Sequence, residues 1–341
     1  MAGGPRVLCA PDAFKGTASA TDLADAMAAG ARRAGWAADR CPLSDGGEGF
    51  AEVLGVLGGE LRTTPVTGPL GGTVTARWRF AASAAGPIAV IECAAASGLA
   101  LVGGAEGNDP VAATSRGTGE LVVAAVAAGA TRILVGAGGS ATTDGGAGAV
   151  AAIEEAGGLG GAAVEVACDV RTGFLDAARV FGPQKGAGPV QVAELQRRLA
   201  CLARRYRERY GVDVTTMPGA GAAGGLAGGL AALGARLEPG FELVAAAVGF
   251  GSRLAAVDLV VTGEGRFDAT SWQGKVTGEV VRLARRRGVP ALIVAGSVAP
   301  GTPRRGARVV DLVARCGLDA ARGEPGRCVA DAVTAHLTNA R

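Results

Sequence analysis

The segment RILVGAGGSATTDGGAGAV, residues 132–150, passes from a short apolar run through a glycine-rich loop into a second apolar segment. The first run predicts a buried strand and the second a helix, and the loop between them carries Ser140, Thr142 and Asp144 among glycines. Consecutive backbone N–H groups in such a loop can bind an anion, helped by the dipole of the following helix. The segment therefore predicts an α/β fold and suits phosphate binding, although a capped helix start without a ligand would look the same.

The same alternation extends along the chain. Apolar runs that predict strands occupy residues 6–10, 88–93, 132–135, 164–168, 258–262, 290–295 and 309–313. Helical spacing of apolar residues is found at 19–34, 118–128, 190–210 and 277–287. Such alternation is typical of a mainly parallel sheet. Residues 62–83 differ, because Thr and Val alternate there around a glycine-rich turn, which predicts antiparallel hairpins.

The length of 341 residues indicates two domains. A boundary is expected near residue 60, where the pattern changes. Because the runs at 291–295 and 309–313 resemble the first strand, we expect them to rejoin its sheet. The predicted first domain is therefore discontinuous, comprising residues 1–60 and 280–341, and the second comprises residues 61–279.

Composition excludes several classes of function. The formal charge of +3, from 34 basic and 31 acidic residues, lacks the basic excess of nucleic-acid-binding proteins. A single histidine, His336, leaves no His-based triad and no paired-His zinc site. The seven cysteines form no CxxC pair and are expected to be buried and reduced. Neither a signal peptide nor a membrane span is predicted, so we expect a soluble, cytoplasmic protein.

Charged residues gather in glycine-flanked loops. Three lysines occur beside 31 arginines, and each of them, Lys15, Lys185 and Lys275, adjoins a glycine. A compact ammonium in such a loop suits a phosphate or carboxylate oxygen. Acidic residues occupy loops of the same kind: Asp12, Asp45, Glu48, Asp169, Glu264 and Asp268. The carboxyl ends of parallel strands are where α/β folds bind ligands, although each acid alone could be a helix cap or a loop ion pair.

These residues favour phosphoryl transfer, which requires cationic groups around the phosphate, magnesium on carboxylates and a carboxylate that accepts the hydroxyl proton. The P-loop pattern does not occur, since Gly274-Lys275 is followed by Val276. Two alternatives stay open: a nicotinamide-dependent oxidoreductase built on residues 136–141, and a ligand-binding protein without turnover.

Seven segments, taken in order, resemble the bacterial glycerate kinase family. They are APDAFKG (10–16), PLSDGGEG (42–49), TSRGTGEL (114–121), GGSATTDGGAG (138–148), VFGPQKG (180–186), PGAGAAGG (218–225) and TGEGR (262–266). The resemblance implies phosphorylation of D-glycerate by ATP with Mg²⁺, to 2- or 3-phosphoglycerate. It also implies a Rossmann- or flavodoxin-like domain, a mixed α/β domain, an active site in the cleft between them, and a monomer or homodimer.

Roles for individual residues follow from the same resemblance. Asp45 is expected to be the base, with Asp169 as second choice, while Lys15 and Arg266 hold the glycerate carboxylate or the transferring phosphoryl group. Further substrate contacts are expected from Asp12 and Glu48. The expected ATP contacts are Gly138, Gly139, Ser140, Thr142, Lys185, Gly221 and Lys275. The expected magnesium ligands are Asp144 and Glu264.

The chain departs from the family at residues 149–166, a short glycine-rich link where relatives usually carry several tens of additional residues. The Asn-Pro-Leu that usually follows Asp169 is replaced by RTGFL at 171–175. These differences leave open a kinase of another small hydroxy acid, or an impaired homologue that binds ligands without turnover.

Overall fold

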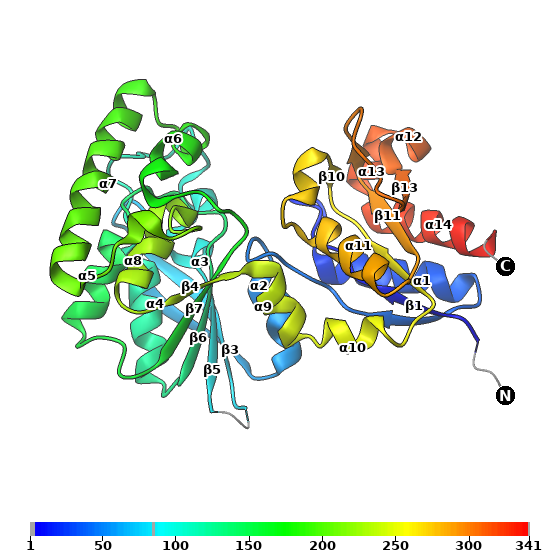
Figure 1. The fold of residues 1–341 in the computed structure, drawn as a ribbon, viewed down its shortest axis with the longest axis horizontal. Coiled ribbons are helices and arrows are strands. Elements are labelled where there is room, and N and C mark those ends of the chain that lie inside the picture. Colours follow the sequence, from blue (N-terminus) through cyan, green and yellow to red (C-terminus); the bar gives the residue numbers. More distant parts are fainter. Residues whose placement is uncertain (1–3, 84–85, 340–341) are drawn as a thin grey trace. The chain divides into compact units, whose positions relative to one another are not determined.

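The computed structural model describes residues 4–83 and 86–339, which form two units, each with its own sheet (Figure 1). Unit 1 comprises Met1–Asp45 and Phe241–Arg341, and unit 2 comprises Gly46–Gly240. The boundaries differ from those predicted at residues 60 and 280. Residues 46–60 fold with unit 2, and residues 241–279 fold with unit 1 because they supply a central strand of its sheet.

The sheet of unit 1 is five-stranded and parallel, in the order β13-β11-β9-β1-β2. Its strands are β1 (Arg6–Cys9), β2 (Ala37–Arg40), β9 (Leu259–Thr262), β11 (Ala291–Ala295) and β13 (Arg308–Asp311). The last two strands rejoin the sheet of the first, as predicted. The strand predicted at 309–313 is wrong at its end, since β13 ends at Asp311. The side chain of Asp311 accepts a hydrogen bond from the N–H of Ala314 and caps the helix that follows. A short parallel pair, β10 (Arg266–Phe267) and β12 (Ser297–Val298), accompanies this sheet.

Unit 1 contains seven α-helices among the described residues, of which α9 begins at the last residue of unit 2. They are α1 (Ala20–Arg33), α9 (Gly240–Ala247), α10 (Phe250–Leu254), α11 (Val276–Arg286), α12 (Leu312–Cys316), α13 (Leu318–Gly323) and α14 (Pro325–Thr338). Leu23 and Met27 of α1 and Val329 of α14 belong to one fully buried core with strand residues. The two helices pack closely because Gly30 has no side chain: a Cβ there would lie 2.3 Å from the carbonyl oxygen of Ala330.

Unit 2 contains a six-stranded mixed sheet in the order β3-β4-β5-β6-β7-β8. Its strands are β3 (Glu60–Thr67), β4 (Thr73–Ala81), β5 (Ile88–Glu92), β6 (Arg132–Gly136), β7 (Ala163–Cys168) and β8 (Arg236–Pro239). β3, β4 and β5 pair antiparallel, whereas β5 to β8 are parallel. The hairpin predicted at 62–83 is therefore present, and the α/β class is confirmed for both units.

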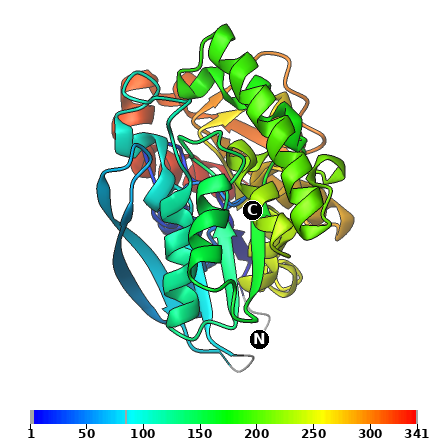
Figure 2. The same cartoon turned by 90° about the vertical axis from the view of Figure 1, so that its left-hand side faces the viewer.

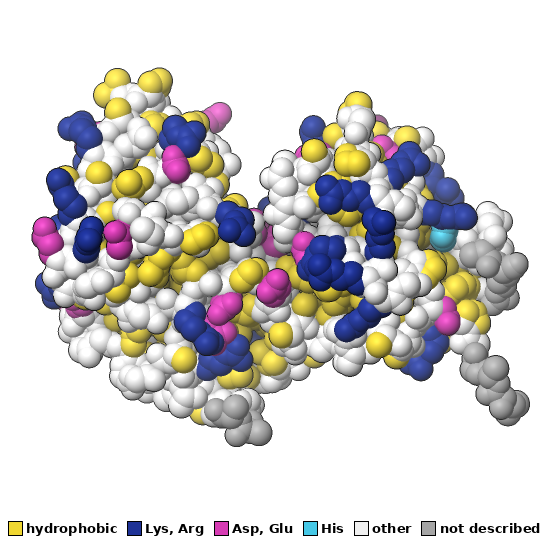
Figure 3. Space-filling view, viewed as in Figure 1, with side chains coloured by type: hydrophobic (Ala, Val, Ile, Leu, Met, Phe, Trp, Pro, Cys, Tyr) yellow, Lys and Arg dark blue, Asp and Glu magenta, His cyan; other side chains and the backbone are white. Residues whose placement is uncertain are grey.

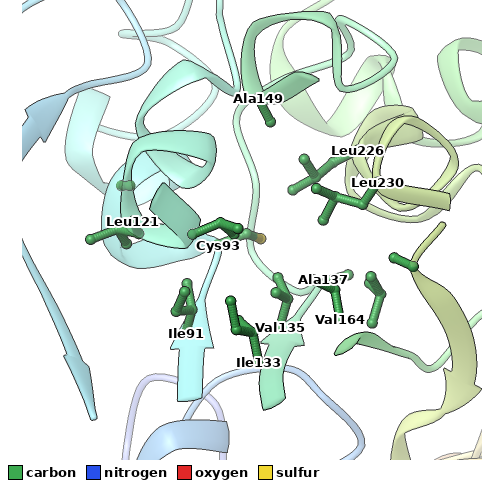
Figure 4. Packing of buried hydrophobic residues seen from close by; sticks show 14 of the residues in the cluster. Ile91, Cys93, Leu121, Ile133, Val135, Ala137, Ala149, Val164, Leu226 and Leu230 are labelled. Carbon is green, nitrogen blue, oxygen red and sulfur yellow. The ribbon is translucent and has the colours of Figure 1, made fainter. Parts of the chain in front are cut away.

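Helices α4 (Arg116–Ala127), α5 (Ala147–Glu155) and α8 (Leu226–Ala232) cover one face of this sheet (Figure 2). Figure 4 shows Leu121 from α4 and Leu226 from α8 on the side of the sheet that carries Ile91, Ile133 and Val135. Unit 2 also contains α2 (Phe50–Val53), α3 (Ala94–Ser97), α6 (Ala177–Phe181) and α7 (Pro189–Tyr210). The strand, glycine loop and helix of residues 132–150 thus lie at the centre of the unit.

Charged side chains are unevenly spread over the described surface. In Figure 3, Lys and Arg gather over the part of unit 1 that contains α11, whose C-terminal end carries exposed Arg285, Arg286 and Arg287. Cations at this end suit the negative pole of the helix dipole. Within residues 4–83 and 86–339, no helix is both long and apolar enough to span a membrane.

The cysteine prediction needs a correction. Cys9, Cys41, Cys93, Cys168 and Cys328 are buried, as expected, but Cys201 and Cys316 are exposed. Cys201 has apolar neighbours in sequence, Ala200 and Leu202, but lies on the exposed face of its helix, and Cys316 follows the exposed Arg315.

Candidate functional site

A pocket of about 430 Å³ opens in unit 1 at the carboxyl ends of its parallel strands. Its lining brings together seven residues that the sequence singles out: Asp12, Lys15, Asp45, Glu264, Arg266, Asp268 and Lys275. The volume suits a small metabolite rather than a macromolecule.

Strand pairing delivers three carboxylates to this pocket. β1 lies between β2 and β9, and the pairing continues past the strand ends, where the N–H of Asp12 donates to the carbonyl of Gly263 at 2.9 Å. The N–H of Leu43 likewise donates to the carbonyl of Pro11 at 3.0 Å. Asp12, Asp45 and Glu264, which follow these three strands, therefore meet at one edge of the sheet.

Charge crowding changes the proton affinity of two of these acids. Burial, followed by the nearby Asp45 carboxylate, raises the pKa of Asp12 well above its ordinary value. Burial also raises the pKa of Glu264. The hydroxyls of Ser271 and Thr277 have the opposite effect and lower the pKa, but burial is the larger cause. Asp12 and Glu264 hold protons more tightly than free carboxylates do, as is typical of functional sites.

A tight turn presents Lys15 at the pocket. The N–H of Phe14 donates to the carbonyl of Ala18 at 2.9 Å, and the N–H of Ala18 donates back at 3.0 Å. Gly16 adopts φ +74° at the tip, and the side chain of Lys15 stays exposed. Ser19 then caps α1 by accepting from the N–H of Asp22.

The other cations come from two further segments. Arg266, on β10, is exposed and lies 3.6 Å from Asp268, and the ammonium of Lys275 donates to the hydroxyl of Thr270 at 3.0 Å. Arg322 of α13 also lines the pocket and was missed by the sequence analysis. One arginine among many on a helix carries no distinguishing signal, so only the packing of α13 reveals it.

Glu264 fits a magnesium ion, although no group of three or more His, Cys, Asp or Glu among the described residues forms a ready-made metal site. Magnesium in kinases is usually held by one or two carboxylates, with substrate phosphates and water completing the shell. The Oε1 atom of Glu264 is buried and has no hydrogen-bond partner within the described chain. Such an oxygen, lining the pocket beside Asp12, is suited to a hard cation.

The glycine loop of unit 2 is built around buried polar groups. Ser140, Thr142 and Thr143 are at most 6% exposed. Within the described chain, the N–H groups of Gly138, Gly139 and Thr143 and the Thr143 hydroxyl have no hydrogen-bond acceptor or partner. Unpaired N–H groups in a loop before a helix are what an anion nest requires.

Lys185, predicted as a phosphate contact, holds the glycine loop of unit 2. It is 3% exposed, and its ammonium donates to the hydroxyl of Ser140 at 2.9 Å and the carbonyl of Thr142 at 2.7 Å. Burial lowers its pKa to about 8. Two of the three ammonium donors are used within the chain, and contact with a phosphate stays a prediction.

Asp144, predicted as a magnesium ligand, makes four hydrogen bonds within unit 2. Its Oδ2 accepts from the N–H of Ser115 at 2.8 Å, the hydroxyl of Ser115 at 2.7 Å and the N–H of Gly148 at 3.2 Å. Its Oδ1 accepts from the N–H of Gly146 at 3.1 Å. These bonds join the glycine loop to the start of α4, and a role of Asp144 in holding magnesium stays a prediction.

The remaining predicted residues of unit 2 have less specific surroundings. Gly221 is buried, and a Cβ there would lie 2.4 Å from the carbonyl oxygen of Gly173, so close backbone packing explains this glycine. Glu48 is exposed in the loop before α2. Asp169 is half-buried directly after β7, and its role as an alternative base stays a prediction.

Comparisons with known proteins agree with this geometry. The model of the glycerate kinase family matches residues 7–157 and 156–317. The chain is 40% identical over 328 residues to the glycerate 2-kinase of Escherichia coli K12, covering 86% of this chain and 85% of the relative. It is 39% identical over 328 residues to the glycerate kinase of Bacillus subtilis 168, with the same coverage of both chains.

A solved structure gives the same result. The crystal structure of a candidate glycerate kinase 2 from Salmonella typhimurium LT2 superposes with a TM-score of 0.83 at 34% identity, covering 99% of this chain and 98% of that one. The two stretches of the family match meet at the turn between α5 and β7. The match nevertheless spans both units, and the chain belongs to the glycerate kinase family.

Proposed function

We propose that this kinase transfers the γ-phosphoryl group of ATP to the 2-hydroxyl of D-glycerate in a magnesium-dependent reaction. The observation that carries the proposal is the pocket of unit 1, which combines Asp12, Asp45 and Glu264 with Lys15 and Arg266. A relative at 40% identity is named glycerate 2-kinase, which favours the 2-hydroxyl over the 3-hydroxyl.

The pocket supplies both charges that glycerate needs. The exposed cations Lys15 and Arg266 can hold its carboxylate through charge-assisted hydrogen bonds. We assign the proton acceptor to the Asp12–Asp45 pair. Burial, and after it the nearby Asp45 carboxylate, raises the pKa of Asp12, so Asp12 readily takes up the proton that the substrate hydroxyl loses on attack.

Other groups suit the phosphates of ATP. Lys275 lines the pocket of unit 1 and suits a phosphate oxygen of ATP. Within unit 2, the unpaired N–H groups of Gly138, Gly139 and Thr143 suit an anion, and their role as ATP contacts stays a prediction. Glu264 would hold magnesium, which when bound would neutralise charge that develops on the transferring phosphoryl group.

A coupled ADP-release assay with ATP, Mg²⁺ and D-glycerate tests this proposal, and adding enolase to the product reports the position of phosphorylation. Immediate consumption of the product by enolase supports 2-phosphoglycerate. Turnover without consumption would show phosphorylation at the 3-hydroxyl. If the folded protein releases no ADP with D-glycerate but turns over another small hydroxy acid from a test panel, that acid would replace glycerate as the proposed substrate.

A further inference from the structure

Two cysteines that the kinase chemistry does not use lie against each other in unit 1. The Sγ atoms of Cys316, the last residue of α12, and Cys328, in α14, are 2.9 Å apart. A disulfide bond is about 2.05 Å long, so bond formation requires an approach of less than about 1 Å. Both side chains are free thiols.

The pair combines an accessible sulfur with a protected one. Cys316 is exposed, whereas Cys328 is 5% exposed. Burial raises the pKa of the Cys328 thiol to about 11, so Cys316 is the thiol that meets a reagent first. A buried partner in contact with an exposed thiol is the arrangement of an attacking and a resolving cysteine.

The segment between the two cysteines belongs to the pocket. Residues 317–327 contain all of α13, and Leu318, Ala321 and Arg322 of that helix line the pocket of unit 1. A bond between Cys316 and Cys328 would close a loop around α13 and hold both of its ends.

We propose that Cys316 and Cys328 form a dithiol modification site that reacts with low-molecular-weight disulfides and thereby braces the pocket helix α13. The Cys316 thiolate attacks one sulfur of the reagent, the reagent's S–S bond breaks, and one thiolate leaves and takes a proton from water. Cys328 then loses its proton and attacks Sγ of Cys316, which forms the intramolecular bond and releases the second thiolate. The protein loses two electrons and two protons, and the reagent is reduced to two thiols.

The test uses the full-length folded protein incubated with oxidised glutathione, with a sample kept in dithiothreitol as the reduced reference. After remaining thiols are alkylated, peptide mass analysis is expected to find residues 316 and 328 linked. Amide hydrogens of α13 are expected to exchange at least about 10-fold more slowly in the oxidised protein, because the loop restricts local opening.

Matched variants separate the site from general thiol oxidation. Cys201→Ser removes the other exposed cysteine and should leave the link intact, whereas Cys316→Ser should abolish it. Cys328→Ala should leave glutathione attached to Cys316. Stable glutathionylation of Cys316 in the unaltered protein, linkage of Cys316 to another chain, or unchanged exchange of α13 in the linked protein would each overturn the proposal.

Discussion

At the scale of single residues, the buried carboxyl group of Asp12 opposes stability when it is ionised. Its pKa is raised in the folded protein, so the cost is absent below the ordinary carboxyl pKa, grows as the pH rises, and is fully present above the folded pKa. Asp12→Asn keeps an oxygen for the N–H of Ala13, which donates to Oδ1 at 2.8 Å. We expect the variant to stabilise unit 1 by roughly 1 kcal/mol at pH 8 and to lower kcat at least about 100-fold.

Thermal unfolding at pH 8 and in acid, together with the ADP-release assay, checks this expectation. The stability difference should vanish in acid, where Asp12 is protonated in the unaltered protein. Asp319→Asn, at an exposed position of the same unit, is the control and should change neither quantity. A less stable Asp12→Asn protein at pH 8 would show that the carboxylates do not repel one another.

Lys185 gives a prediction with the opposite pH dependence, because the buried group is a cation and not a carboxylate. Its pKa is lowered from 10.5 to about 8, so between these values the unfolded chain binds more protons and stability rises with pH. The shift corresponds to about 3 kcal/mol at most. Urea unfolding from pH 7.5 to 10.5 should show the unaltered protein gaining stability relative to Lys185→Met. Parallel stability curves would mean that the ammonium is not desolvated.

At the scale of elements, the glycine loop depends on a close approach by residues 222–225. Gly224 has φ +68°, and a Cβ there would lie 1.9 Å from the carbonyl oxygen of Thr142. Gly211, which ends α7 with φ +71°, has open space at the same position. Both alanine variants bear the cost of a left-handed backbone, about 1 kcal/mol. Gly224→Ala should lower the free energy of unfolding, measured in urea, by at least about 2 kcal/mol more than Gly211→Ala does. Equal losses in the two variants would show that the loop relaxes freely.

The junction between the glycine loop and α4 depends on Asp144. Asp144→Asn replaces one accepting oxygen by an NH₂ group that cannot accept, and should destabilise unit 2 by about 2 kcal/mol. The magnesium concentration for half-maximal rate should stay unchanged, whereas Glu264→Gln should raise it. If Asp144→Asn raises this magnesium concentration tenfold without loss of stability, Asp144 acts as a metal ligand.

At the scale of the whole molecule, each unit has its own sheet and its own buried core. We therefore expect scanning calorimetry to resolve two unfolding transitions. Asp12→Asn should raise one of them and Gly224→Ala should lower the other. If both variants shift a single transition, the units unfold as one cooperative body.

Local patterns were enough to predict most elements of this fold. Val7, Leu8 and Cys9 of β1 are completely buried, and such short apolar runs are typical of parallel strands covered on both faces. The pattern failed at Leu312 and Val313, which are as apolar as a strand but follow a capping Asp311. The predicted unit boundaries differ from the observed ones because the local sequence does not show which strands pair. The pairing of β9 with β1, which joins residues 241–279 to unit 1, is visible only in the sheet.

The sequence by itself determined the α/β class, the family and the acids at the strand ends, because these depend on local periodicity and on segments of contiguous residues. Tertiary structure alone decided which charges are available to a ligand. Asp12, Asp45 and Glu264 meet because strands distant in sequence are neighbours, whereas Asp144 accepts a hydrogen bond from Ser115 and Lys185 donates one to Ser140. A hydrogen-bond partner far along the chain leaves no local trace, so loops with similar sequences can either bind a ligand or hold the fold together.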